Sequence, residues 1–155
     1  MRPSLPVVNL WIGLLVFLAF ASDAQARLVS LSIERREVVL DGHAFGLAGP
    51  YEKLVGTAHF AVDPDLPQNQ IIVDLKLAPR NVHGEVEFSS DFYLLKPVDP
   101  SRSNGRLFYE AGNRGSKRIL QIFQKASRSA DPTTGEEFGD GVLMSRGFSF
   151  LWMGW

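Results

Sequence analysis

The chain has 155 residues and a formal net charge of −1, so its overall charge offers no attraction to nucleic acid or to an anionic membrane surface. Hydrophobic residues make up 45% of the sequence, which is enough for a packed core and argues against global disorder. The sequence has no cysteine, which excludes disulfides, thiolate catalysis and cysteine metal sites together. No cofactor is expected, and the length fits one small domain or part of a larger one.

The N-terminus has the pattern of a secretory signal peptide. Arg2 supplies a short positive region, residues 7–21 are almost wholly apolar, and Ala24-Gln-Ala26 forms a small-x-small cleavage site. We therefore predict a signal peptide over 1–26 that is cleaved after Ala26, and a secreted or periplasmic mature chain with no membrane partner. The alternative is an uncleaved anchor, although the apolar run is shorter than the roughly 20 residues of a membrane span.

The first half of the mature chain predicts a β-meander. Apolar and polar residues alternate over 29–33, 58–62, 71–77 and 86–95, and glycine- and proline-rich turns separate these segments. Period two indicates strands that bury one face. The charged run 34–37 is expected to interrupt the first strand.

The second half of the chain predicts a crossover between two parallel strands. Consecutive apolar residues at 107–109 and 148–155 are typical of strands covered on both faces. Between them we expect a helix capped by Ser116 and a short helix at 142–146 closed by Gly147. The sequence thus predicts an α/β fold in which an antiparallel meander leads into a parallel strand–helix–strand unit. Because the chain stops at its last apolar strand, we expect that strand to form an open edge of an incomplete sheet.

Five blocks of residues in a fixed order carry a resemblance to a known family. They are 45–53 (FGLAGPYEK), 73–81 (VDLKLAPRN), 91–97 (DFYLLKP), 113–115 (NRG) and 131–134 (DPTT). Together they resemble the N-terminal part of a bacterial, often exported, group of α/β-hydrolase domain proteins. The resemblance implies an α/β-hydrolase fold, with esterase-like serine hydrolase activity on a small ester-like substrate in intact relatives. It also implies that residues 27–155 are the N-terminal portion of the domain and that the catalytic C-terminal portion is absent.

A glycine-rich turn follows the apolar run 107–109 and is the candidate functional loop. In the α/β-hydrolase fold, the loop after the third strand helps to form the oxyanion hole, and by position Gly112, Asn113, Arg114 and Gly115 match that loop. A phosphate-binding loop is excluded, because Gly112-Asn-Arg-Gly-Ser-Lys117 is too short for the required motif. Two interpretations stay open, which are an oxyanion loop with a backbone N–H donor and a plain strand-to-helix turn.

The sequence contains no candidate for the catalytic triad. Ser149 lacks the Gly-x-Ser-x-Gly context of a nucleophile elbow. His43, His59 and His83 all precede the candidate loop, whereas the catalytic histidine of this fold comes last, so structural roles are expected for them. Their spacing gives no metal-binding pair. We therefore predict that the chain as given has no catalytic residue and is inactive.

The alternative function is a non-catalytic exported β-rich module that binds carbohydrate or protein. It would use aromatic side chains such as Tyr51, Phe92 or Trp152 on its surface, although Trp152 in a covered strand is also expected to be core. The acidic pairs at 63/65 and 136/137 are expected to lie in solvated turns. The sequence predicts no oligomeric state.

Overall fold

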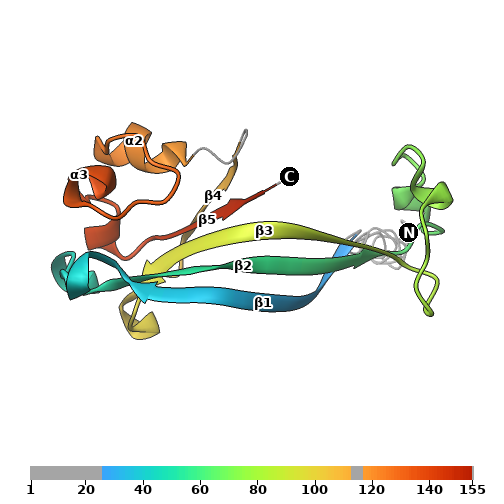
Figure 1. The fold of residues 1–155 in the computed structure, drawn as a ribbon, viewed down its shortest axis with the longest axis horizontal. Helices are drawn as coiled ribbons and strands as arrows, with labels where there is room; N and C mark the ends of the chain where they lie inside the picture. The colour runs from blue at the N-terminus through green and yellow to red at the C-terminus, as the bar shows by residue number, and fades with distance from the viewer. Residues whose placement is uncertain (1–25, 113–116, 155) are drawn as a thin grey trace, which may run out of the picture. The chain divides into compact units, whose positions relative to one another are not determined.

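The computed structural model describes residues 26–112 and 117–154 (Figure 1). This part of the chain falls into two compact units, one formed by residues 26–27 with 62–86 and the other by 28–61 with 87–112 and 117–154. The second unit holds the hydrophobic core and most of the sheet. The first unit is a long connection between two strands, held by the ion pairs Arg27–Glu85 and Arg80–Asp65.

The sheet is mixed and has five strands in the order β1-β2-β3-β5-β4. The strands are β1 (Ala26–Val38), β2 (Tyr51–Val62), β3 (Val86–Pro97), β4 (Leu107–Ala111) and β5 (Ser149–Met153). Figure 1 shows β1 and β3 running opposite to β2. β5 pairs antiparallel with β3 and parallel with β4. An α/β-type sheet, with a meander that leads into a parallel pair, is therefore confirmed.

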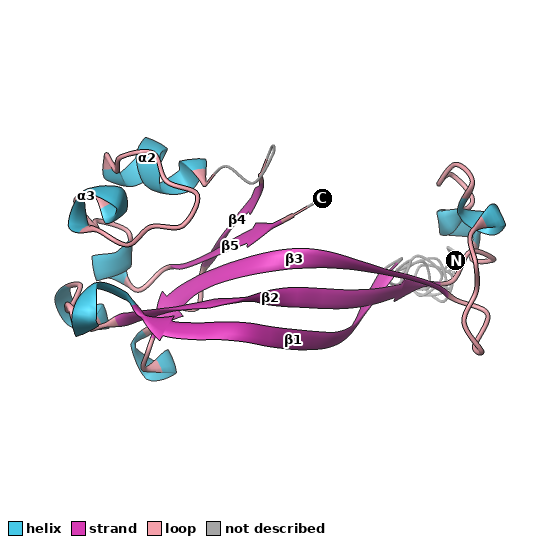
Figure 2. Ribbon diagram, viewed as in Figure 1, coloured by secondary structure: helices cyan, strands magenta, loops and turns pink. Residues whose placement is uncertain are grey.

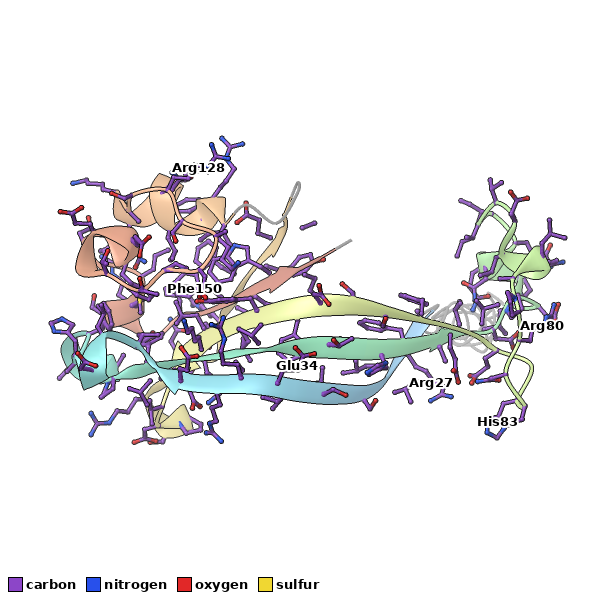
Figure 3. All side chains as sticks on the ribbon, viewed as in Figure 1. Arg27, Glu34, Arg80, His83, Arg128 and Phe150 are labelled. Atoms are coloured by element: carbon purple, nitrogen blue, oxygen red, sulfur yellow. The ribbon has the colours of Figure 1, made fainter. Side chains whose placement is uncertain are left out.

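Short helices cover one face of this sheet (Figure 2). They are α2 (Arg118–Gln124), α3 (Gly135–Phe138) and a 3₁₀ helix, Met144–Arg146. Gly147 ends the last helix in a left-handed conformation, with φ of 77°, as the sequence predicted. The core lies between the helices and the sheet, and Figure 3 shows Phe150 of β5 in that layer.

Two buried polar side chains hold the helices in place, Tyr51 by linking them to the sheet and Gln124 by linking them to one another. The Tyr51 hydroxyl of β2 donates to the carbonyls of Met144 (2.8 Å) and Phe148 (2.9 Å). The Gln124 side chain donates to the carbonyl of Phe138 and accepts from two backbone N–H groups at 143 and 144. Since buried polar groups are stable only when they are hydrogen-bonded, these contacts fix how the helices dock.

The prediction of a strand at 71–77 is wrong. Turns occupy most of this segment, followed by a 3₁₀ helix, Leu75–Leu77, and Asp74 has a left-handed φ of 61° that interrupts an extended chain. The apolar side chains are solvent-exposed, at 80% for Ile71 and 84% for Val73. Alternation predicts a strand only where a core can receive the apolar face, and the first unit provides none here.

Three other expectations about the strands are also corrected. β1 runs without interruption through 34–37, because Arg35 and Arg36 form ion pairs on opposite sides of the strand. β4 is not covered on both faces, since Leu107 and Tyr109 are 53% and 56% exposed. The open edge belongs to β4 rather than to the last strand, because the crossover inserts β5 between β3 and β4.

Candidate functional site

The carboxyl ends of β4 and β5 form the part of the sheet where α/β proteins commonly bind ligands. A small pocket of about 230 Å³ opens there. Its lining includes Gly112 directly after β4, Lys117 before α2, and Tyr93 and Trp152 from the paired strands β3 and β5. The structure thus brings the first residue of the candidate loop together with a cation and two aromatic rings.

Glu110 of β4 organises the backbone on both sides of the candidate loop. Its Oε2 atom accepts hydrogen bonds from the N–H groups of Arg118 (2.9 Å) and Ile119 (3.1 Å) at the start of α2. The same oxygen accepts from the indole Nε1 of Trp152 (2.6 Å). A carboxylate at a helix N-terminus complements the helix dipole and satisfies N–H groups that have no partner within the helix. Glu110 therefore joins β4, β5 and α2 at one point.

Lys117 lies half-buried beside this pocket. Its ammonium is 4.4 Å from the centre of the Tyr93 ring and donates to the carbonyl of Ala130. Desolvation by burial lowers the pKa of Lys117, because a buried ammonium loses its hydration. A positive charge that is poorly hydrated interacts more strongly with any anion that enters the pocket.

A charged network lies beside Tyr93 on the same face of the sheet. Lys53 of β2 is buried, and its ammonium contacts Asp131 and Glu37 at 3.0 Å each, while Arg35 also contacts Asp131. Burial alone would raise the pKa of Asp131, but the hydrogen bonds from Lys53 and Arg35 outweigh it and hold the pKa below its ordinary value. The network fixes the 131–134 segment onto β1 and β2.

The hydroxyl of Tyr93 is buried near the Asp131 carboxylate, but among the described residues it makes no hydrogen bond of good geometry. Burial, together with the nearby Asp131 carboxylate, raises the pKa of Tyr93. The hydroxyl is therefore neutral at physiological pH and can still donate a hydrogen bond.

The four residues predicted for an oxyanion loop are described only in part. Gly112 is buried at the end of β4 and lines the pocket. Asn113, Arg114 and Gly115 lie outside the described residues, as does the predicted helix cap Ser116. α2 begins at Arg118, and its first N–H groups are satisfied by Glu110.

The histidines take up structural positions. The Nε2 atom of His59 lies 3.2 Å from the Ser32 hydroxyl on the surface of the β1–β2 pair. His43 packs edge-on against Phe45, and His83 lies exposed in the turn of the first unit. None of the three lines the pocket at Gly112.

The aromatic residues named for the binding-module alternative are not on the surface. Tyr51, Phe92 and Trp152 are 0%, 5% and 4% exposed, so the core role expected for Trp152 is confirmed. The acidic pairs do lie in turns or at a helix start. Asp65 pairs with Arg80, and Glu137 caps α3.

Sequence reasoning overlooked Glu110 and Lys117. A signal for Glu110 was present, because in the strand 107–111 it alternates with Phe108 and so points toward the same face. An acid at an inward-facing position, just before a glycine turn, requires donors that only the folded chain supplies. Lys117 had no comparable signal.

No protein-family description, curated protein sequence or solved structure was found to match this chain. Within residues 26–112 and 117–154, no three acidic or histidine side chains come together as metal ligands. In the same part of the chain, no helix has the length and apolar character that crossing a membrane requires.

Proposed function

We propose that this chain is the N-terminal portion of an exported α/β-hydrolase domain of the serine-esterase type. It would supply the early sheet and the loop beginning at Gly112, while the nucleophile, acid and histidine come from a later part of the domain. The proposal includes a cleaved signal peptide over 1–26 and a secreted or periplasmic mature chain.

The observation that carries the proposal is the strand order at β3, β5 and β4. The later strand β5 lies between the two earlier ones, antiparallel to β3 and parallel to β4. In the α/β-hydrolase fold the fourth strand likewise lies between the second and the third. With β1 as an additional N-terminal strand, β4 corresponds to the third strand of that fold, and the loop after it begins at Gly112.

The contacts around the loop also fit this role. A loop that offers backbone N–H groups to a developing oxyanion has to be held rigidly, because preorganised donors are what stabilise the transition state. Glu110 holds the helix start that follows the loop, and Lys117 adds a positive charge beside the pocket. One correctly placed backbone donor contributes about 3 kcal/mol to such a reaction.

The first test is an activity assay. Purified residues 27–155 should not hydrolyse a short-chain nitrophenyl ester, because the proposal places every triad residue elsewhere. Clear turnover that a serine-directed reagent abolishes would overturn the proposal.

The second test is the gene itself. A reading frame that continues beyond codon 155 and encodes Gly-x-Ser-x-Gly, then an acid and then a histidine supports the hydrolase. A stop codon at that point, with a soluble monomeric product, contradicts it and favours a non-catalytic binding module.

A further inference from the structure

β1 forms one outer edge of the sheet, and the side of this strand that points away from β2 is uncovered (Figure 1). Among the described residues, the backbone of 28–38 is hydrogen-bonded only within the sheet, where β2 is the one neighbour of β1. All thirteen residues of β1 are exposed to solvent. An edge strand presents a row of N–H and C=O groups, so it is a template for pairing with a further strand.

The middle of β1 lacks the features that normally protect an edge strand. Residues 28–33 (LVSLSI) contain no charged residue, proline or glycine, whereas lysine, proline and inward-pointing charges are the usual means of blocking strand addition. The charged run that follows gives little protection, because Arg35, Arg36 and Glu37 form ion pairs with groups of the same chain. An exposed, uncharged segment of this kind is prone to aggregation unless another strand covers it.

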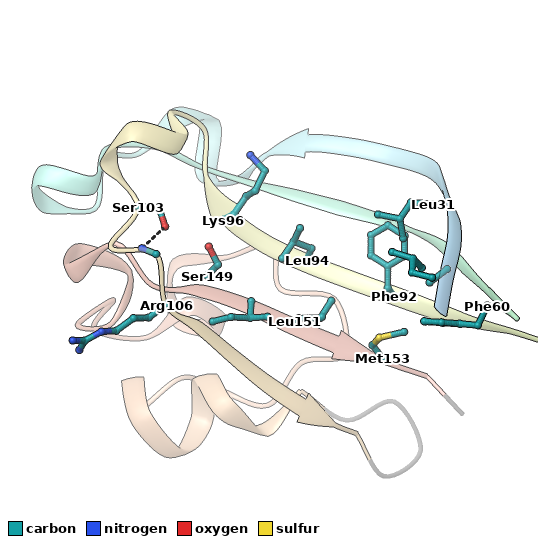
Figure 4. A pocket seen from close by; sticks show the side chains of 14 residues that line it. Leu31, Phe60, Phe92, Leu94, Lys96, Ser103, Arg106, Ser149, Leu151 and Met153 are labelled. Carbon is teal, nitrogen blue, oxygen red and sulfur yellow. Dashed lines mark hydrogen bonds between the residues drawn. The ribbon is translucent and has the colours of Figure 1, made fainter. Parts of the chain in front are cut away.

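The other open surfaces of the sheet differ from the edge at β1. The opposite edge strand, β4, is only five residues long, and in the proposed hydrolase domain the later strands join the sheet beyond it. The face opposite the helices has an apolar groove lined by Leu31, Leu94 and Leu151 among others (Figure 4), and the later part of the same domain is available to cover it. Neither surface therefore requires a separate partner, whereas β1 remains an edge strand in the complete domain.

We propose that β1 pairs antiparallel with β1 of a second copy of this chain, around a twofold axis that passes through 28–33. The proposal rests on the proposed function only in placing the later strands beyond β4. A second copy presents the same edge, and closed twofold dimers are the commonest assemblies of identical chains. Since 28–33 is uncharged, the two strands meet at their centre without like charges facing each other.

The length and side chains of β1 also suit this pairing. Antiparallel pairing along most of its thirteen residues forms about ten backbone hydrogen bonds, whereas the five residues of β4 allow about half as many. The aliphatic side chains of the central segment are 50–54% exposed, and each gains a neighbour across the twofold axis: Leu28, Val29, Leu31 and Ile33.

Sedimentation equilibrium of the purified protein over a wide range of concentrations tests the pairing. We expect a reversible equilibrium between monomer and dimer that stops at the dimer. Ile33→Lys brings a positive charge from each copy close to the twofold axis and removes an aliphatic contact, so it should weaken dimerisation by at least about tenfold.

Leu107→Lys is the matched control for this variant. Leu107 is 53% exposed and Ile33 is 54% exposed, so both substitutions should leave the core intact. Leu107 lies on the opposite edge strand and lines the apolar groove, whereas Ile33 does not line the groove. Leu107→Lys should therefore dimerise like the wild type, and circular dichroism verifies that each variant is folded.

Hydrogen exchange locates the interface in the wild-type protein. Backbone N–H groups alternate along an antiparallel strand, so every second N–H of β1 points away from β2. Within 28–33, the amides that point outward should exchange rapidly in the monomer and become protected as the protein concentration is raised, while the amides bonded to β2 stay protected throughout. This measurement decides the proposal if Ile33→Lys does not fold.

Several results would overturn the proposal. They are a protein that stays monomeric at every concentration, a dimer that Leu107→Lys weakens as much as Ile33→Lys does, and outward amides of β1 whose exchange does not depend on concentration. Association that continues beyond the dimer would also overturn it, because twofold pairing closes at two copies. A failure of the pairing by itself leaves the hydrolase proposal standing, because that proposal is decided by the reading frame beyond codon 155.

Discussion

Replacement of Glu110 tests whether a single carboxylate holds the two sides of the candidate loop together. In Glu110→Leu the indole N–H of Trp152, which is 4% exposed, loses the acceptor that the structure gives it. An unsatisfied buried donor costs about 1–3 kcal/mol, and loss of a helix cap costs about 1 kcal/mol more. The free energy of unfolding should therefore fall by about 2–4 kcal/mol, a large part of the total for a small domain.

Glu110→Gln separates the charge from the hydrogen bonds. The amide oxygen can still accept from Arg118 and Ile119, but the interaction of a full negative charge with the helix dipole is lost. This variant should be destabilised by only about 1 kcal/mol. A stability close to that of Glu110→Leu would mean that the charge, rather than the acceptor, is what matters.

Urea unfolding followed by tryptophan fluorescence measures these differences. Glu136→Gln is the matched control, because Glu136 is exposed and its side chain has no hydrogen bond to another described residue; it should change stability by less than about 0.5 kcal/mol. The indole N–H resonance of Trp152 should be protected from exchange in the wild type and in Glu110→Gln, but not in Glu110→Leu. If Glu110→Leu unfolds at the same urea concentration as the wild type, the carboxylate does not hold the loop and the reasoning is refuted.

Three further predictions concern buried and capping polar groups. Backbone N–H groups of the Thr133–Thr134 turn lower the pKa of Glu137 from its ordinary value of 4.5 to about 2. The carboxylate therefore stabilises the fold fully above pH 4.5, and this contribution is lost as the pH falls toward 2. When unfolding is measured across this pH window, the free energy of unfolding should fall less for Glu137→Gln than for the wild type. Gln124→Leu leaves two N–H groups without their acceptor and should lower the unfolding free energy by about 2–4 kcal/mol, whereas an unchanged urea midpoint would show that the docked helices do not need it. Tyr51→Phe removes one hydroxyl at constant shape and should cost about 1–2 kcal/mol, measured in the same way, with no loss of helical circular dichroism.

The candidate site was only partly accessible to sequence reasoning. The glycine turn after 107–109 directed attention to the carboxyl end of β4, where Gly112 lines a pocket. The partners of that turn were not visible, because Glu110 acts on Arg118 and Trp152 through contacts that depend on how β5 is placed. The role of Lys117 depends in the same way on its burial against Tyr93.

The sequence by itself determined two of the strands of the meander and the end of one helix. The period-two segments at 58–62 and 86–95 are strands, and Gly147 ends a helix, because backbone preferences and side-chain alternation act within a few residues. Where the same alternation at 71–77 met no core, it formed turns. A local pattern thus predicts a strand only on condition that another part of the chain covers it.

The tertiary structure decided which strand is an edge, where the charges find partners and which face stays open. The insertion of β5 beside β3 turned β4 into the edge strand, and it left one face of the sheet as an apolar groove with Lys96 at its end. Lys53 and Asp131 are paired across 78 residues of sequence. These features arise from contacts between distant segments, and neither periodicity nor turn residues specify which segments will meet.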